Sequence, residues 1–216
     1  MSRRRPPPTA LRALQALLAM SVLLAAGCAA PRSPRWHSLL PALPAPATEA
    51  DLAAAARQPT ITMSLAQPVV PVQVDQPQWL VRLPDQSLAL LEDERWASPL
   101  RDELRAALRE QLARRWAVTT AASSADSAVA WRVDVELLRF ESIPAQAAWI
   151  DARWTLTPPR GSAGKAVSCG AVLREPVADG SMALAEGHRR AVARLADRIG
   201  RQLRQGGGSD CGADPG

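Results

Sequence analysis

The stretch that decides the fold is residues 131–137, Trp-Arg-Val-Asp-Val-Glu-Leu, with apolar residues at the odd positions and charged residues at the even ones. Residues 150–156, Ile-Asp-Ala-Arg-Trp-Thr-Leu, also alternate, with the apolar residues at the even positions. Because successive side chains of a strand point to opposite faces, each stretch predicts a strand with one buried side. Such strands are typical of antiparallel sheets. The open face is expected to carry cross-strand ion pairs among its charged residues, which are Arg132, Asp134, Asp151 and Arg153.

Short apolar runs elsewhere predict further strands. They lie at residues 36–40, 61–65, 69–74, 79–83, 87–91 and 167–173. Pro68 and Pro71 suggest edge positions, because proline lacks the N–H that a central strand needs. Pro84-Asp85-Gln86 is turn chemistry and predicts a hairpin between the runs that flank it. Residues 41–59 are rich in proline and alanine and are expected to form a surface connection, with a turn of helix near residues 50–57.

Two amphipathic helices are predicted. In the first, Ser98 is expected to be the cap and Pro99 the first helical residue. Its apolar stripe recurs every four residues and consists of Leu100, Leu104, Leu108, Leu112 and Trp116. The second helix is expected from about Ser181 to Gln205. The order of strands, helix, strands and helix predicts an α+β fold, a largely antiparallel or mixed β-sheet with two amphipathic helices packed on one face.

The second helix carries an arginine face made of Arg190, Arg194, Arg198 and Arg201. This face predicts a solvated helix surface, and a contact for phosphate head groups or an acidic partner is the alternative. His188 lies on the apolar stripe of the same helix, which favours a packed histidine over a metal ligand.

The N-terminus predicts a secretory signal peptide. A basic start is followed by an apolar run over residues 16–26, shorter than the roughly 20 residues of a membrane-spanning helix. Leu24-Ala25-Ala26-Gly27-Cys28 resembles a bacterial lipobox, in which lipid is attached to the cysteine and the signal is cleaved before it. We therefore expect lipidation of Cys28, with ordinary cleavage and no modification as the alternative. Because Ala29 follows the cysteine, the resemblance favours the outer membrane of a Gram-negative bacterium.

Removal of the signal changes the charge balance. The full chain has 26 basic and 21 acidic side chains, a net charge of +5. Residues 1–27 contain four of the arginines and no acids, so the mature chain has a net charge of +1. A nearly neutral chain gives no reason to expect a nucleic-acid partner.

Two cysteines remain in the mature domain, Cys169 and Cys211. In an oxidising compartment such an even pair predicts a disulfide, with two free thiols as the alternative. Because His37 and His188 are the only histidines, neither a metal site nor a Ser-His-Asp triad is predicted. We expect no enzyme activity and no cofactor.

These features divide the chain into four segments. They are a signal peptide at residues 1–27, a lipidated N-terminus and short linker at 28–35, a single α+β domain at 36–205, and a flexible glycine-rich tail at 206–216. Three consecutive glycines at the start of the tail give it the freedom to fold back.

The order of several motifs resembles the auxiliary lipoproteins of ABC-type transporters, the family typified by paraquat-inducible protein C (PqiC). Val69-Val70-Pro71-Val72 and residues 75–82, Asp-Gln-Pro-Gln-Trp-Leu-Val-Arg, are similar to a proline-valine element followed by aspartate-x-proline-x-hydrophobic-x-x-arginine. Residues 95–100, Arg-Trp-Ala-Ser-Pro-Leu, are similar to the family's opening of the first helix. The resemblance covers about residues 36–204.

The resemblance implies a non-catalytic, periplasm-facing outer-membrane lipoprotein that serves an ABC/MCE-type intermembrane lipid transport system and supports envelope integrity. It implies an MCE-domain (PqiB-like) transporter subunit as partner, membrane attachment through the N-terminal lipid, and a homo-oligomeric ring. An envelope-assembly lipoprotein that assists insertion of outer-membrane components is the alternative, and an envelope hydrolase is a third hypothesis.

The segment at residues 75–82 and the tryptophans supply candidate partner contacts, since Trp and Arg are favoured at interface hot spots. The candidates are Asp75, Trp79, Arg82, Trp96 and Trp149. Trp149 lies on the polar face of its predicted strand, which makes it the better contact candidate. Core packing is the alternative for each tryptophan.

Overall fold

The computed structural model describes residues 33–41, 60–121, 129–208 and 211. From Pro34 onward the chain forms one compact unit. The expected signal peptide, the lipidation site Cys28 and the turn of helix near residues 50–57 lie outside the described residues.

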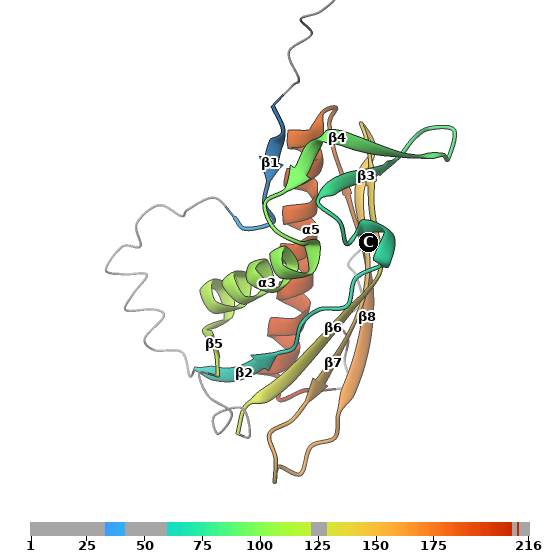
Figure 1. The fold of residues 1–216 in the computed structure, drawn as a ribbon. Coiled ribbons are helices and arrows are strands. Elements are labelled where there is room, and N and C mark those ends of the chain that lie inside the picture. Colours follow the sequence, from blue (N-terminus) through green and yellow to red (C-terminus); the bar gives the residue numbers. More distant parts are fainter. Residues whose placement is uncertain (1–32, 42–59, 122–128, 209–210, 212–216) are drawn as a thin grey trace, which may run out of the picture. The chain divides into compact units, whose positions relative to one another are not determined.

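The described residues contain eight strands, two α-helices and one short 3-10 helix (Figure 1). The strands are β1 (Arg35–His37), β2 (Ile61–Leu65), β3 (Gln78–Arg82), β4 (Leu88–Trp96), β5 (Val118–Thr120), β6 (Trp131–Ile143), β7 (Ala147–Thr157) and β8 (Val167–Pro176). The helices are η1 (Val72–Val74), α3 (Leu100–Trp116) and α5 (Ser181–Arg204).

All eight strands belong to one mixed sheet. Its order is β1-β4-β3-β6-β2-β5, and β7 and β8 continue it from β6. The pairs β6–β7, β7–β8 and β3–β4 are antiparallel, whereas β2 and β3 run parallel to β6. Both helices lie on the same side of β6, β7 and β8 (Figure 1). The predicted α+β fold is therefore confirmed.

Residues 61–82 follow β6 along one of its edges and supply two of its neighbours. β2 pairs with the start of β6, Val69 makes a single bridge to its middle, and β3 pairs near its end. The strand predicted at residues 69–74 is wrong, because apart from that bridge the segment forms η1. Pro68 and Pro71 have no N–H to donate, so the ladder cannot continue between the two strands.

β6 runs well past the predicted residues 131–137. A bulge within it exchanges the positions that face the core with those that face outward. The pairing with β7 skips Leu138, which is 46% exposed. Before the bulge the odd positions are buried, and after it the buried residues are Phe140 and Ser142. An extra residue of this kind bends the strand and changes which positions face the core. The alternation in the sequence is therefore interrupted while the strand continues.

α5 packs against β7 and β8, and α3 packs against α5. The predicted stripe of α3 is fully buried at Leu100, Leu104, Leu108 and Leu112. Two glycines allow α5 to approach its neighbours closely. At Gly187 a Cβ atom would lie 2.9 Å from the Cβ of Ala148 in β7, and at Gly200 it would overlap the ring of Trp116.

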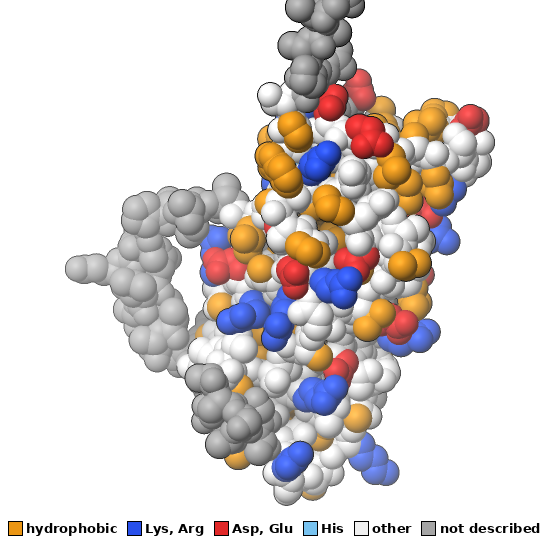
Figure 2. Space-filling model, viewed as in Figure 1, with side chains coloured by type: hydrophobic (Ala, Val, Ile, Leu, Met, Phe, Trp, Pro, Cys, Tyr) orange, Lys and Arg blue, Asp and Glu red, His pale blue; other side chains and the backbone are white. Residues whose placement is uncertain are grey.

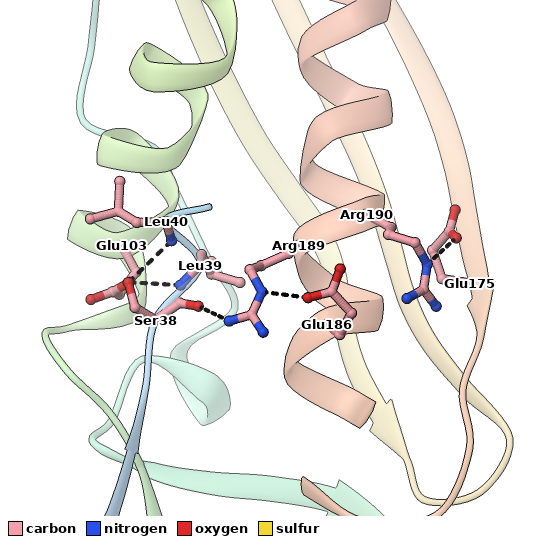
Figure 3. Close-up of polar contacts among 8 residues, drawn as sticks. All are labelled: Ser38, Leu39, Leu40, Glu103, Glu175, Glu186, Arg189 and Arg190. Carbon is pink, nitrogen blue, oxygen red and sulfur yellow. Dashed lines mark hydrogen bonds and ion pairs between the residues drawn. The ribbon is translucent and has the colours of Figure 1, made fainter. Parts of the chain in front are cut away.

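The start of α3 differs from the prediction. Its N-cap is Pro99, and the expected side-chain cap by Ser98 is absent. The Ser98 hydroxyl instead donates to the buried carboxylate of Glu103 (3.0 Å), which also accepts from the Ser38 hydroxyl (2.6 Å) and the Leu39 N–H (2.8 Å) (Figure 3). A buried carboxylate requires several donors, so Glu103 fixes the chain after β1 to the helix.

The described part of the predicted tail is held against the domain. Gly206 ends α5 with a φ of +69°, a left-handed conformation that glycine adopts without strain. The N–H of Gly207 donates to the carbonyl of Gln202 (2.9 Å), and a Cβ at Gly207 would lie 2.6 Å from the ring of Trp131. The backbone at the start of the tail therefore packs directly against the ring of Trp131.

Candidate docking face

Trp149 lies on the face of the sheet that points away from α5. Its neighbours Ala148 and Ile150 are buried, whereas Trp149 is half-buried. The guanidinium of Arg139 lies 4.5 Å from the centroid of the Trp149 ring, and that of Arg174 lies 5.5 Å away. Two cation–π contacts thus hold the ring at the surface. Its Nε1–H has no hydrogen-bond partner among the described residues.

The strand register places Trp149 in a row that crosses four strands. Glu141 of β6 is directly opposite Trp149, which is directly opposite Arg174 of β8. From β3, Arg82 donates to Glu141 through Nε (3.1 Å) and Nη2 (2.8 Å). We call these four residues the transverse row, and they are Arg82, Glu141, Trp149 and Arg174.

The ion pair in the transverse row holds both of its charges in place. Hydrogen bonding to Glu141 and its negative charge raise the pKa of Arg82. The same hydrogen bonds lower the pKa of Glu141, against the effect of burial. Arg82 also donates to the carbonyl of Gln86 (3.1 Å) in the β3–β4 turn. Since a bidentate pair is specific in its geometry, Arg82 is held in one orientation beside the face.

Asp75 lies outside this row. It follows η1 and forms an ion pair with Arg101 in the first turn of α3. Its side chain is only 12% exposed. The carboxylate therefore has a partner within the chain, and it joins η1 to α3.

Trp79 and Trp96 lie in the core, and this corrects their prediction as surface contacts. They are 1% and 3% exposed, with ring centroids 4.4 Å apart. Trp79 points to the inner side of β3, and a bulge in β4 turns Trp96 to the same side. The structure therefore shows core packing, which was the alternative for each of them. A buried ring offers no surface to a partner.

His188 belongs to the same aromatic core. Its ring stacks on Phe140 with centroids 4.0 Å apart, and its Nε2 lies 2.8 Å from the Oγ of Ser142. Burial lowers the pKa of His188 to about 3, so the ring is neutral near pH 7. Its Nδ1 has no partner among the described residues. A serine–histidine pair that is sealed from solvent gives a substrate no access, and this geometry does not support the hydrolase hypothesis.

The arginine face of α5 is largely compensated by the sheet. Glu175 of β8 accepts from Arg190 (3.2 Å, Figure 3) and from Arg194 (2.8 Å). Arg198 is 8% exposed. Because one carboxylate already binds two of the four guanidiniums, the face stabilises the packing of α5 on β8, which weakens the head-group alternative.

The disulfide predicted between Cys169 and Cys211 is present in the structure, with Cα atoms 5.4 Å apart. Cys169 is on the inner face of β8 and is 4% exposed. Gln202 of α5 donates to its Sγ (3.2 Å) and accepts from the indole of Trp154 (2.7 Å). The bond therefore joins the tail to β8 beside the last turn of α5.

Two further features bear on function. Within the described residues, no group of three or more His, Cys, Asp or Glu side chains is placed to hold a metal ion. In the same part of the chain, no helix has the length and apolar character needed to cross a membrane.

Several residues of the face were not among the predicted contacts. They are Arg139, Glu141 and Arg174. The alternation did indicate that charged side chains occupy the open face. Their meeting at Trp149 depends on the register of three strands and on the bulge at Leu138, and neither is visible in a local pattern.

The chain belongs to the family of ABC-type transport auxiliary lipoprotein components, whose family model matches residues 42–200. The resemblance seen in the sequence motifs is thereby confirmed. No curated protein matches the chain.

Two solved structures are similar to this one. A crystal structure of an uncharacterized protein has a TM-score of 0.59 and 18% identity, and covers 80% of this chain and 99% of that chain. Protein XCC0632 from Xanthomonas campestris has a TM-score of 0.58 and 20% identity, and covers 81% and 96% respectively. At these identities the likeness shows the fold alone.

Proposed function

We propose that the protein is an outer-membrane-anchored, periplasm-facing lipoprotein that acts as a non-catalytic docking component of an ABC/MCE-type intermembrane lipid transport system and supports envelope integrity. Its family supports a role within a transporter assembly. The observation that carries the docking role is the transverse row, an open sheet face that presents tryptophan and arginine. The proposed partner is an MCE-domain transporter subunit, and a homo-oligomeric ring belongs to the same proposal.

The chemistry of the face indicates what a partner must supply. The ring of Trp149 is half-buried in contact with the guanidiniums of Arg139 and Arg174, and Arg174 makes no ion pair with another described residue. Leu138 and Val172 lie near them and are 46% and 51% exposed. A partner that brings a carboxylate to Arg174 and an apolar side chain to Leu138, Val172 and the Trp149 ring would complement this face. Tryptophan and arginine with apolar neighbours are the usual centre of a protein interface.

A photoreactive amino acid at position 149 tests this docking role in intact cells. We expect crosslinking to an MCE-domain protein, because the side chain points outward from the sheet. The matched control places the same group at Arg160, which is exposed in the β7–β8 loop, at the opposite end of β7 from Trp149. Capture of β-barrel assembly factors without any MCE-domain protein would favour the envelope-assembly alternative and overturn the proposal.

Replacement of Cys28 by alanine tests the anchor separately. The mature chain is expected to leave the membrane fraction, because the two or three acyl chains on Cys28 would hold the protein on the bilayer. Fractionation of outer and inner membranes measures this. Retention of Cys28→Ala in the outer membrane would show that the anchor assignment is wrong.

A further inference from the structure

A groove of about 430 Å³ lies between β4 and the first turn of α5. We propose that this β4–α5 groove binds an extended, positively charged segment of another protein, which adds to the sheet as a short strand along β4. None of the four residues of the transverse row lines the groove. The inference therefore goes beyond the proposed docking face and does not depend on it.

The backbone of β4 is available on this side. β3 pairs with one edge of β4 from Leu88 onward, whereas β1 pairs with the other edge only at residues 94–96. Along Leu88–Asp93, no described strand occupies that second edge. Pro34 precedes β1 and has no N–H, so the ladder of β1 does not extend further along β4. An unpaired edge presents N–H and C=O groups to an incoming strand.

The walls of the groove are partly apolar. Its lining includes Leu90 and Leu91 of β4, Pro144 of the β6–β7 turn and Leu184 of α5. Leu90 is 45% exposed and its strand neighbour Leu88 is 53% exposed. Around β4, at the top of the view, hydrophobic and acidic side chains lie side by side (Figure 2). Such exposed leucines at a concave site are typical of a binding surface.

The rim of the groove is negative. Glu92, Asp93 and Asp179 border it, and neither Glu92 nor Asp93 forms an ion pair with another described residue. Arg35 also lines the groove, but its charge is compensated by the ion pair with Glu94. The carboxylate of Asp179 accepts from the N–H of Gly180 (2.8 Å), which leaves its charge uncompensated. These three charges attract a cationic partner and repel phosphate head groups and nucleic acids.

Glu94, the third acid of the β4 bulge, has a structural role, in contrast to Glu92 and Asp93. Glu94 is 4% exposed, accepts from His37 Nε2 (2.6 Å) and pairs with Arg35. Burial acts to raise the pKa of Glu94, but hydrogen bonds from His37, Ser181 and Arg35 lower it overall. Glu94 thus secures β1 to β4. Glu92 and Asp93, the two acids that precede it, line the groove and form no ion pair with another described residue.

The open edge, the leucines and the acids of the groove together suit an extended segment. Side chains of an extended segment alternate between two faces. On β4 each side carries a leucine followed by an acid, Leu90 and Glu92 on one side and Leu91 and Asp93 on the other. A segment that mixes basic and apolar residues therefore meets a matching group on either side of the strand. The segment that fits is short and extended, and carries Lys or Arg between apolar residues.

The probe is a labelled heptapeptide, Lys-Val-Lys-Val-Lys-Val-Lys, titrated into the full chain purified in detergent. We expect saturable binding by fluorescence anisotropy, at least tenfold weaker for the matching Glu-Val peptide and for a peptide with proline at its centre. Equal binding of the three peptides, or binding of none, would overturn the proposal. These arms use the unaltered protein and do not depend on whether any variant folds.

Charge reversal on the protein locates the site. Glu92→Lys/Asp93→Lys is expected to weaken peptide binding at least tenfold. The matched control is Asp134→Lys/Glu136→Lys, which makes the same charge change on β6 outside the groove and should bind as the unaltered chain does. An equal loss in both variants would reduce the effect to overall charge and overturn the proposal. If the groove variant alters the oligomeric state without peptide, the occupant is a second copy of the chain, and the proposal is likewise wrong.

Discussion

His188 shows how one residue responds to its place in the core. The sequence predicted a packed histidine from its position on the apolar stripe, and the structure buries it fully against Phe140, Trp79 and Trp96. The hydrogen bond to Ser142 and the low pKa could not be predicted from the stripe. Ser142 faces inward only because the bulge in β6 exchanges the two faces of that strand.

Stability should depend on pH through His188. Its pKa is about 3 in the folded chain and about 6.5 when unfolded, so only the unfolded state gains this proton as the pH falls between those values. Stability is therefore complete above pH 6.5 and falls below it. We expect a loss of about 2 kcal/mol between pH 7 and pH 5. Urea unfolding at several pH values measures this loss.

The matched variant for this measurement is His188→Gln, which keeps a donor for Ser142 but does not titrate. Its unfolding free energy should fall much less across the same interval. The pKa values of Glu94 and Glu141 are lowered from the ordinary 4.5, so these two groups reduce stability only as the pH falls from about 4.5 downward, below this interval. Parallel curves for the two proteins would show that His188 does not control this dependence.

At the scale of elements, the local patterns predicted type and extent well where one periodicity persisted. β2, α3 and α5 closely match the predicted ranges, and the β3–β4 hairpin turns at Pro84-Asp85-Gln86 as expected. Two local predictions failed. Ser98 bonds Glu103 and does not cap α3, because Glu103 also holds Ser38 and Leu39, which are distant in the sequence. Residues 69–74 follow β6 without forming a strand, because Pro68 and Pro71 interrupt the ladder.

The crossing of α3 and α5 depends on Gly200. Alanine is normally favoured over glycine in a helix by about 1 kcal/mol. Here a Cβ would overlap the ring of Trp116, which is held by a hydrogen bond from its Nε1 to Asp197 (3.1 Å). We therefore expect Gly200→Ala to lower the free energy of unfolding by about 1–3 kcal/mol, measured by urea denaturation. Gly170→Ala is the control, because its Cβ would lie 3.5 Å from the nearest atom, the Ala152 carbonyl oxygen. Equal or higher stability of Gly200→Ala would contradict this account of the crossing.

At the level of the whole molecule, the disulfide joins Cys169 and Cys211, which are 42 residues apart, and the loop it closes contains all of α5. Closing a loop of this length stabilises a fold by roughly 4 kcal/mol in the chain-entropy account. The helix it encloses packs on β7, β8 and α3. Loss of the bond should therefore affect global unfolding and not only the tail.

We expect Cys211→Ser to unfold at lower denaturant than the oxidised protein, with a loss of about 3–4 kcal/mol. A thiol reductant should lower the stability of the unaltered chain to a similar level and leave Cys211→Ser unchanged. Guanidinium unfolding with and without reductant measures both effects. If the reductant has no effect on the unaltered chain, the bond does not contribute to global stability.

Most of the helices and strands, the α+β class, the even cysteine pair and the family could be predicted, because they depend on periodicity, composition and motif order along the chain. Only the folded structure shows which tryptophans are buried and that Trp149 meets Arg139 and Arg174. Burial depends on the face that each strand turns toward α5, and a single extra residue at Leu138 reverses that face. Likewise, the edge of β4 is open because β1 is short, and its acids matter only where α5 closes a groove beside them.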